Sequence, residues 1–318
     1  MPIERSEWIW IDDQWKPWDE ATVHLTTHGL HYGSSVFEGI RAYDTGETTA
    51  VFRLGPHVQR LFDSCRIMRM DPGYTQDQVE ELCIEAVARN RLESCYIRPL
   101  IYRGNEEMGL NPTSCSSRLA IYAVRWGRYL GEEAIEQGVD AAISSWRRFN
   151  SNTAVPLGKI SGQYVTNQFV SIEAREHGYA EGIMLDDRGL VCEGAGENLF
   201  LIRDGVVYTP PLYNSILGGI TRNSVITIAR DLKYDVRFQP IAREELYLAD
   251  ELFMTGTAAE VSPVRSVDRI PIGSGTRGKI THHLQEEFFG LVEGRIPDRH
   301  NWLTQVPRLQ EAAKPLAG

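Results

Sequence analysis

The chain has 318 residues, of which 42% are hydrophobic and 24% are charged, and its formal net charge is −10 at pH 7. This composition predicts a folded globular protein of one large or two ordinary domains, and it excludes a fibrous or wholly disordered chain. The negative charge and the lack of clustered Lys and Arg argue against a nucleic-acid partner.

The cysteines and the apolar segments bear on the compartment. The five cysteines are scattered, odd in number and without CxxC spacing, which indicates reduced thiols and no zinc site. The N-terminal sequence MPIERSEWIW lacks the apolar core of a secretory signal. Because no apolar run approaches the roughly 18–20 residues of a membrane span, we expect a cytoplasmic protein with no membrane partner and no metal.

The first part of the chain alternates strand-like and helix-like segments. Residues 36–43 (VFEGIRAY) and 49–54 (TAVFRL) are predicted as strands. A helix is predicted from Gly55 because Pro56 suits the first turn, and its apolar stripe is expected to be Val58, Leu61, Phe62 and Cys65. A second helix with helical apolar spacing follows it. Strands are then predicted within residues 94–104 and 118–126.

A polar, glycine-punctuated segment separates these elements from the rest, and residues 129–137 are predicted as an interdomain linker. Beyond it we expect a strand at residues 141–146 and then a loop that carries Lys159. The next predicted helix spans residues 161–177, and its apolar face is expected to consist of Val165, Phe169 and Ile172.

Short strands separated by glycine turns come next, at residues 182–185, 190–194, 198–202 and 206–210, and they predict an antiparallel meander. A helix after LGGIT, a strand at residues 251–257 and a final helical region complete the chain. The mixture predicts an α+β fold of two domains, residues 1–128 and 138–318, with a cleft between them.

The segment GSGTRGK at residues 273–279 resembles two nucleotide-binding motifs but satisfies neither. Ile280 follows the lysine where a P-loop needs Ser or Thr. Pro271 precedes the segment and is unsuited to the buried strand of a dinucleotide site. We therefore predict a loop that leads into a helix. The adjacent His282 and His283 face different directions on that helix, which is poor geometry for a metal.

Lys159 is the only formally charged residue between positions 149 and 172. It precedes a helix, whose positive N-terminal end would favour the neutral amine if the residue is partly buried. A free lysine near pKa 10.4 is less than about 0.1% neutral at pH 7, so a nucleophilic lysine needs such an environment. Taken alone, however, the segment favours an ordinary lysine in an exposed loop.

Four other features leave their interpretation open. In CEGAGEN, Glu193 is either a turn-stabilising group or a partner for a ring nitrogen. LGGIT offers either an anion site at a helix N-terminus or simple capping by Thr221. Arg60 lies away from the apolar stripe of its helix and faces either solvent or a phosphate. Tyr96 and Arg98 share one face of a strand. This face either binds a carboxylate beside an apolar side chain or belongs to an edge strand whose arginine extends to solvent.

Together and in this order, these segments resemble the branched-chain amino acid aminotransferases of the fold type IV class of pyridoxal-phosphate enzymes. The resemblance runs from HGLHYGSSVFEGIRAY through YIRPL, EGAGENLF, TPP and LGGITR to LYLADELFMTGTAAEVSPVRSVD. It implies a smaller N-terminal α/β domain and a larger C-terminal domain with a mostly antiparallel, barrel-like sheet. The active site is expected in the cleft between them.

The resemblance also implies residues for pyridoxal 5'-phosphate. Lys159 would bind the cofactor covalently and then transfer the proton, Glu193 would face the pyridine nitrogen, and Tyr164 would donate to the phenolic oxygen. The implied cofactor-binding residues are Arg60, Lys159, Tyr164, Glu193, Leu217, Gly219, Ile220, Thr221, Gly256 and Thr257.

For the substrate, the resemblance implies that Tyr96 and the backbone at Thr257 and Ala258 bind the α-carboxylate. Arg98 would meet the distal carboxylate of glutamate. The remaining implied contacts are pocket walls from Phe37, Trp126, Tyr129 and Tyr164, and contributions from a partner subunit by Tyr32 and Leu110.

The reaction implied is a ping-pong transfer of the amino group from L-leucine, L-isoleucine or L-valine to 2-oxoglutarate, in a homodimer or a hexamer built as a trimer of dimers. D-amino-acid aminotransferases, (R)-amine transaminases and aminodeoxychorismate lyases share the lysine, the glutamate and the phosphate cup. YIRPL, with Tyr96 and Arg98, favours the branched-chain group and leaves D-amino acids and (R)-amines as side activities.

Overall fold

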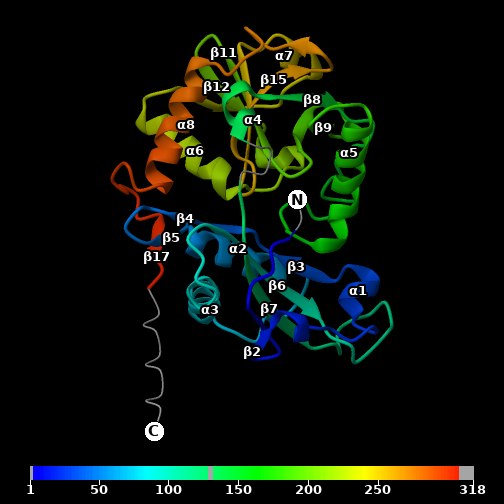
Figure 1. Cartoon of the computed structure of the whole chain (residues 1–318). Coiled ribbons are helices and arrows are strands. Elements are labelled where there is room, and N and C mark those ends of the chain that lie inside the picture. The colour runs from blue at the N-terminus through cyan, green and yellow to red at the C-terminus, as the bar shows by residue number, and fades with distance from the viewer. Residues whose placement is uncertain (1–2, 128–131, 308–318) are drawn as a thin grey trace.

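The computed structural model describes residues 3–127 and 132–307. Two β-sheets form two halves of the molecule, one above the other in the view of Figure 1. The first sheet is built almost wholly from the N-terminal part of the chain and the second from the C-terminal part. The predicted α+β architecture is confirmed.

The first sheet is antiparallel throughout, in the order β17-β5-β4-β6-β7-β1-β2, with β3 paired to β6. Its strands are β1 (Trp8–Ile11), β2 (Gln14–Pro17), β3 (Ser35–Phe37), β4 (Ile40–Asp44), β5 (Thr49–Phe52), β6 (Cys95–Arg103), β7 (Ser117–Arg125) and β17 (Leu303–Gln305). The helical segments of this half are η1 (Trp18–Glu20), α1 (His28–Tyr32), α2 (Leu54–Ile67) and α3 (Gln76–Arg89).

Helices α2 and α3 pack on this sheet through one buried core. The predicted stripe of α2 contributes Val58, Leu61 and Cys65, which are fully buried or nearly so. Helix α3 begins at a capping box, in which the Thr75 hydroxyl accepts from the Gln78 backbone and the Gln78 side chain accepts from the Thr75 backbone. Both predicted helices are therefore confirmed.

The prediction of one strand over residues 36–43 is wrong, because β3 and β4 are separate strands with a break at Glu38 and Gly39. A Cβ atom on Gly39 would lie 1.7 Å from the Tyr96 hydroxyl oxygen, so a side chain at this position would have to displace the Tyr96 ring. The next predicted strand also ends early, since Arg53 has a left-handed φ of 54° and α2 begins at Leu54.

The second sheet follows the order β10-β9-β8-β15-β14-β11-β12-β13, and β10 also pairs with β11, so the strands from β10 to β11 close into a barrel. Its strands are β8 (Val139–Ile143), β9 (Glu181–Leu185), β10 (Val191–Gly194), β11 (Asn198–Arg203), β12 (Val206–Thr209), β13 (Val236–Phe238), β14 (Glu251–Gly256), β15 (Glu260–Val267) and β16 (Ile270–Pro271). The helical segments are α4 (Glu132–Gln137), η2 (Ser161–Gln163), α5 (Tyr164–Glu176), η3 (Leu212–Asn214), α6 (Ile220–Asp231), α7 (Arg243–Tyr247) and α8 (Lys279–Val292).

Most pairings in this sheet are antiparallel, and the predicted meander from β9 to β12 is confirmed. The parallel pairs are β8 with β9, β8 with β15, and β12 with β13. Helices α6 and α8 pack against each other and against β14. Among the residues described, no helix is both long and apolar enough to cross a membrane.

Several segments differ from their predictions. Part of the predicted linker forms helix α4, whose Ala134 and Ile135 are buried. Strand β8 begins and ends earlier than the predicted strand at 141–146. Strand β17 pairs with β5 of the first sheet and is drawn beside it, in red, in Figure 1. The division into residues 1–128, 129–137 and 138–318 remains a prediction.

The predicted buried face of the helix after Lys159 is wrong. Val165, Phe169 and Ile172 are 48%, 41% and 52% exposed, whereas Val170 and Ala174 are buried. A Cβ atom on Gly182 would lie 2.5 Å from a Val170 methyl carbon, so the glycine lets α5 lie close to β9. Both faces carry apolar residues, and spacing alone does not say which face meets the sheet.

The predicted loop before the last helix is confirmed. Helix α8 starts at Lys279, immediately after the GSGTRG stretch. The Glu251 carboxylate accepts hydrogen bonds from the backbone N–H groups of Ile280 and Thr281, at 3.0 and 2.8 Å. A protein carboxylate thus occupies the helix N-terminus that a nucleotide phosphate would need.

The segment that carries Lys159 is anchored on the first sheet. Val36 and Ile160 form an antiparallel bridge, and the Phe37 N–H donates to the Lys159 carbonyl at 3.1 Å. The Gly162 N–H donates to the Gly33 carbonyl at 3.2 Å. Gly33 has a φ of +62°, and a Cβ atom there would lie 2.5 Å from the Gly162 Cα, so only glycine fits this contact.

We predict that Gly33→Ala lowers the free energy of unfolding more than Gly46→Ala, in urea unfolding of the two variants. Both positions have positive φ, which costs an alanine about 1–2 kcal/mol. Only Gly33 faces opposing backbone, and that crowding adds about 1–3 kcal/mol, whereas nothing lies within 4 Å of the Gly46 position. Equal losses would show that the contact with Gly162 is not tight.

Candidate active site

One cavity lies where the Lys159 segment, the turn after β10, the start of α6 and the end of β14 meet. Arg60 reaches it from α2 in the other half of the molecule. All ten residues expected to contact a cofactor line this cavity, namely Arg60, Lys159, Tyr164, Glu193, Leu217, Gly219, Ile220, Thr221, Gly256 and Thr257. Residues spread over nearly 200 positions of the sequence are thereby brought to one place.

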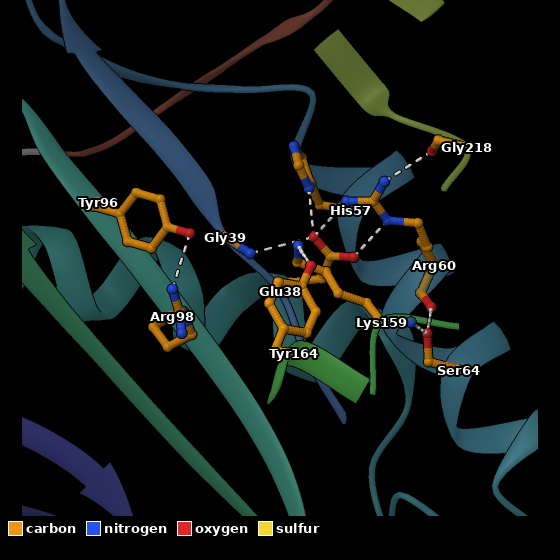
Figure 2. A network of polar contacts seen from close by, with 10 residues as sticks. All are labelled: Glu38, Gly39, His57, Arg60, Ser64, Tyr96, Arg98, Lys159, Tyr164 and Gly218. Atoms are coloured by element: carbon orange, nitrogen blue, oxygen red, sulfur yellow. Dashed lines mark hydrogen bonds and ion pairs between the residues drawn. The ribbon is translucent and has the colours of Figure 1, made fainter. Parts of the chain in front are cut away.

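The Lys159 backbone is fixed from two sides. Its N–H donates to the Ser64 hydroxyl of α2 at 3.0 Å, and its carbonyl accepts from Phe37. The side-chain Nζ donates to the Tyr164 hydroxyl at 2.7 Å and lies 4.8 Å from the centre of the Phe37 ring (Figure 2). Among the described residues no carboxylate pairs with this amine. Its isolation in the sequence is therefore matched in space.

Glu193 is the last residue but one of β10, and its carboxylate is buried and bound on both oxygens. Oε1 pairs with Arg148 at 2.8 Å, and Oε2 accepts from the Asn198 amide and the Leu217 N–H, both at 2.9 Å. Burial raises the pKa of the Glu193 carboxyl, and the Arg148 charge and the Leu217 N–H limit that rise. The predicted turn-stabilising role and a role toward a ligand are thus compatible.

The neighbouring Glu197 also lines the cavity but has a different environment. Its Oε2 accepts from the Gly196 N–H at 3.0 Å. Burial, together with the nearby Glu181 carboxyl, raises the pKa of the Glu197 carboxyl well above its usual value. Of the two glutamates in CEGAGEN, Glu193 is therefore the one with a cationic partner that stabilises the ionised form.

The start of α6 lines the cavity with Gly219, Ile220 and Thr221. The helix begins at Ile220, and its N-cap is Gly219, which has no side-chain cap, so the alternative of capping by Thr221 is wrong. The first turn of a helix leaves backbone N–H groups without intrahelical partners. A Cβ atom on Gly219 would lie 1.9 Å from the Asn198 amide oxygen, so glycine at this position lets the start of α6 lie close to the Asn198 side chain.

Arg60 faces the cavity and not open solvent, since its side chain is only 12% exposed. Its guanidinium pairs with the buried Glu38 carboxylate, which also accepts from His57 (Figure 2). Glu38 and His57 were not predicted from the sequence. Charge inside the predicted strand VFEGIRAY was the one signal that could have marked Glu38.

Tyr96 and Arg98 lie together on β6, as the strand alternation predicted. Arg98 Nη2 donates to the Tyr96 hydroxyl at 3.1 Å, and the guanidinium carbon lies 4.6 Å from the Phe37 ring centre. The Tyr96 and Trp126 ring centres are 5.0 Å apart. Among the described residues Arg98 has no carboxylate partner, so the group is a cation within aromatic walls.

Two further arginines of the site were not predicted. Arg41 of β4 pairs with Glu260 at 3.3 Å and donates to the carbonyls of Ala258 and Gly127, at 3.3 and 3.2 Å. It thereby ties the loop after β14 to the first sheet. Arg148 lies in the loop after β8 and is nearly buried. The local sequence around each of these two residues does not distinguish it from an ordinary surface arginine.

Among the described residues expected to contact the substrate, Tyr164 and Thr257 line this cavity, whereas its lining does not include Tyr32, Phe37, Tyr96, Arg98, Leu110, Trp126 or Ala258. Tyr32 and Leu110 are 47% and 84% exposed, and the Tyr32 hydroxyl donates to the Met108 carbonyl. Their contribution from a partner subunit remains a prediction. Tyr129 lies outside the described residues. In the described part of the chain, no group of three or more His, Cys, Asp or Glu residues is placed to hold a metal.

Comparison with known proteins gives this site its class. Residues 35–267 match the family model for amino-transferase class IV, and the chain belongs to that family. It is an aminotransferase.

Among individual relatives, the branched-chain-amino-acid aminotransferase of Escherichia coli (strain K12) is 48% identical over 307 residues, covering 96% of this chain and 99% of that protein. The Pseudomonas aeruginosa enzyme of the same name is 45% identical over 95% of this chain and 98% of its own length. Within class IV, the chain therefore belongs to the branched-chain-amino-acid aminotransferases.

Solved structures agree with this assignment. The crystal structure of the Escherichia coli branched-chain amino acid aminotransferase matches with a TM-score of 0.94 at 49% identity, over 95% of this chain and 100% of that one. The branched-chain aminotransferase from the thermophilic archaeon Thermoproteus uzoniensis, solved with norvaline, matches with a TM-score of 0.91 at 40% identity, over 95% and 100% of the two chains. A further branched-chain amino acid aminotransferase, solved with pyridoxamine 5'-phosphate, matches with a TM-score of 0.92 at 44% identity, over 95% and 99% of the two chains.

We predict that Arg148→Met destabilises the protein by about 3–5 kcal/mol, because it leaves the Glu193 carboxylate buried without its partner. The double variant with Glu193→Gln should be less destabilised than Arg148→Met alone. Arg237→Met, which removes the cation of an exposed pair with Asp235, is the control and should leave the free energy of unfolding unchanged. Equal effects of both single variants would contradict the importance of the buried pair.

Proposed function

We propose that this protein transfers the amino group of L-leucine, L-isoleucine or L-valine to 2-oxoglutarate by a ping-pong mechanism, with pyridoxal 5'-phosphate as its cofactor. The observation that carries the proposal is that the Lys159 amine, which lines the cavity, and the Arg98 guanidinium lie against the same Phe37 ring, at 4.8 and 4.6 Å from its centre. Such a site offers a nucleophile, apolar walls and one cation for an acidic side chain. The names of the relatives support the same reaction class.

The residues of the cavity fit pyridoxal phosphate. Arg60 and the first turn of α6 supply donors for a phosphate, and the buried Thr255 hydroxyl at the cavity wall has no hydrogen-bond partner in the described structure. In this proposal Glu193 faces the ring nitrogen and Lys159 bonds covalently to the cofactor. A related structure holds pyridoxamine 5'-phosphate, and another is titled as a complex with N-(5'-phosphopyridoxyl)-L-glutamate. When bound, the cofactor supplies an electron sink for bond breaking at the substrate Cα.

Within this proposal, the side chains divide the work. Lys159 Nζ, as a neutral amine, acts first as a general base that removes the proton from the substrate Cα. It then acts as a general acid that donates this proton again as the product forms. Tyr164, in contact with that amine, orients it. Glu193, held by Arg148, Asn198 and Leu217, keeps the ring nitrogen protonated.

The substrate pocket must accept two kinds of side chain in turn. Phe37, Trp126 and Tyr164 supply apolar walls for branched side chains, and Arg98 binds the distal carboxylate of glutamate or 2-oxoglutarate. Tyr96, together with the backbone at Thr257 and Ala258, binds the α-carboxylate. Arg41 supports that loop through the Ala258 carbonyl. Turnover of D-amino acids and (R)-amines is retained as a side activity of the same site.

We further propose a homo-oligomer, a dimer or a trimer of dimers, in the cytoplasm. Tyr32 and Leu110 are exposed side chains that a second copy of the chain would bring to its neighbour's cavity. Other exposed apolar groups support an interface, among them Phe169, whose ring stacks on Trp146 at 4.6 Å between centres.

Lys159→Ala should abolish transamination without unfolding the protein. The wild-type protein should be yellow with the cofactor bound, and borohydride reduction should attach the cofactor mass to the peptide that contains Lys159. Both are consequences of a covalent lysine. Peptide mass spectrometry, circular dichroism and an amino-transfer assay check the three parts. Multiple turnover at near wild-type rate in the variant would refute the assignment.

Arg98→Ala should reduce kcat/KM for 2-oxoglutarate by about 10- to 100-fold, the range expected for lost hydrogen bonds to a charged group. The rate of the half-reaction with leucine should change much less, because its side chain carries no charge. Arg125→Ala, an exposed arginine of the neighbouring strand, is the control. Equal losses with both substrates would remove the proposed role of Arg98.

A further inference from the structure

A buried polar network lies next to the cavity residue Arg60, at the break between β3 and β4. Glu38 is completely buried there, and His57 of α2 is 1% exposed. Figure 2 shows the Glu38 carboxylate between His57 and Arg60, on the side of Arg60 that carries the Nε atom. None of the roles considered so far uses Glu38 or His57.

The carboxylate is bound by four donors. Arg60 Nε and Nη2 donate to its two oxygens at 2.6 and 2.8 Å, His57 Nδ1 donates at 2.8 Å, and the Gly39 N–H lies at 3.3 Å. Burial raises the pKa of the Glu38 carboxyl, but Arg60 and His57 outweigh burial and hold it below its usual range. Glu38 is therefore an anion, and the Nδ1 atom of His57 carries a proton.

This arrangement commits most of the Arg60 guanidinium. Nη1 donates to the Gly218 carbonyl at 2.8 Å, so Glu38 and Gly218 take three of the five N–H donors of the arginine. The two others, one on each terminal nitrogen, belong to a side chain that lines the cavity beside the first turn of α6. A planar guanidinium held at three points cannot rotate, so the direction of its two remaining donors is fixed.

The same helix face also supports the reactive lysine. Ser64, one turn after Arg60, donates its hydroxyl to the Arg60 carbonyl at 2.8 Å and accepts from the Lys159 N–H at 3.0 Å. Arg60 and the Lys159 backbone are thus held by neighbouring turns of α2. The Lys159 backbone is held by Ser64 and not by the Arg60 guanidinium, so a change in the orientation of that guanidinium leaves this hydrogen bond in place. The position of Arg60 and the position of Lys159 can therefore be tested separately.

We propose that Glu38, assisted by His57, is a positioning residue that orients Arg60 toward the phosphate of the cofactor. This inference rests on the proposed function, since it needs pyridoxal phosphate as the ligand. For the loss of the Glu38 charge, this proposal predicts a change in phosphate affinity opposite to the change that electrostatics alone predicts. Removal of a buried anion beside a phosphate site would strengthen phosphate binding by charge, whereas loss of the fixed orientation weakens it.

The test measures dissociation constants of the apoprotein for pyridoxal phosphate and for pyridoxal, which lacks the phosphate. In Glu38→Gln, we expect the dissociation constant for pyridoxal phosphate to rise about tenfold or more, as for a lost hydrogen bond to a charged group. The value for pyridoxal should change by less than about twofold. Tighter or unchanged binding of pyridoxal phosphate, or equal weakening of both ligands, would overturn the proposal.

Controls separate orientation from general loosening. Glu85→Gln disrupts a pair with Arg89 on the surface of α3 and should change neither constant. In an Arg60→Met background, Glu38→Gln should add little, because the group that it orients is gone; full additivity would contradict the proposal. If Glu38→Gln does not fold, His57→Leu serves instead, with a smaller rise of about threefold expected for pyridoxal phosphate alone. No selective rise in that variant would likewise overturn the proposal.

Failure of this inference is distinguishable from failure of the proposed function. If the wild-type apoprotein binds pyridoxal phosphate no better than pyridoxal, or forms no reducible bond at Lys159, the proposed cofactor is wrong. If the wild type strongly prefers pyridoxal phosphate and Glu38→Gln keeps that preference, only the role of Glu38 is wrong.

Discussion

The backbone contact between β3 and the Lys159 segment is the constraint on which the rest of the site depends. The lysine belongs to the half of the chain that builds the barrel, yet its peptide groups bond to Phe37 and Ser64 of the other half. Two glycines, Gly33 and Gly162, allow the backbones to meet. A rotation of one sheet against the other would therefore move the amine directly, so the packing of the two halves determines where the amine lies.

Charge in the cavity is arranged around this fixed amine. Arg148 with Glu193 and Arg60 with Glu38 are two buried pairs, each consisting of one cation and one anion. Because each pair is nearly neutral, neither imposes a strong local field, while the described residues give the Lys159 amine no counter-ion. Buried pairs add little net stability compared with apolar packing. Their value here lies in fixing the direction of donors and acceptors that face the cavity.

The sequence predicted those features that local periodicity determines. The α2 and α3 stripes and the meander from β9 to β12 depend on residues within one turn or one hairpin. At the break between β3 and β4, the Tyr96 side chain lies against Gly39 although the two residues are more than fifty positions apart, and no local pattern contains this contact. The face of α5 was predicted wrongly because the approach to β9 is permitted by Gly182, which lies outside the helix.

The same distinction explains the site. Lys159 stood out by its isolation, but the ten predicted cofactor residues that line the cavity were connected through resemblance to a family and not through spacing. Arg148, Arg41, Glu38 and His57 were missed because their partners are remote in sequence. A buried charged residue is identified by its ion-pair and hydrogen-bond partners in the folded structure, and the charge composition of the sequence does not say which residues these partners are.

Under the proposed function, Arg98 explains how a single site can accept two unlike substrates. A buried guanidinium without a partner is costly, so it would disfavour an apolar side chain beside it. Here the Phe37 and Tyr96 rings lie 4.6 and 5.1 Å from the guanidinium carbon, and the Tyr96 hydroxyl accepts one N–H. Cation–π contacts of about 0.5–2 kcal/mol stabilise the cation when no carboxylate is present. Because they are weaker than a carboxylate pair, an acidic side chain can still compete for the same group. Under the proposed function, the aromatic residues thus have two roles when an apolar substrate is bound. They form the walls of the pocket, and they stabilise the Arg98 cation while it has no carboxylate partner.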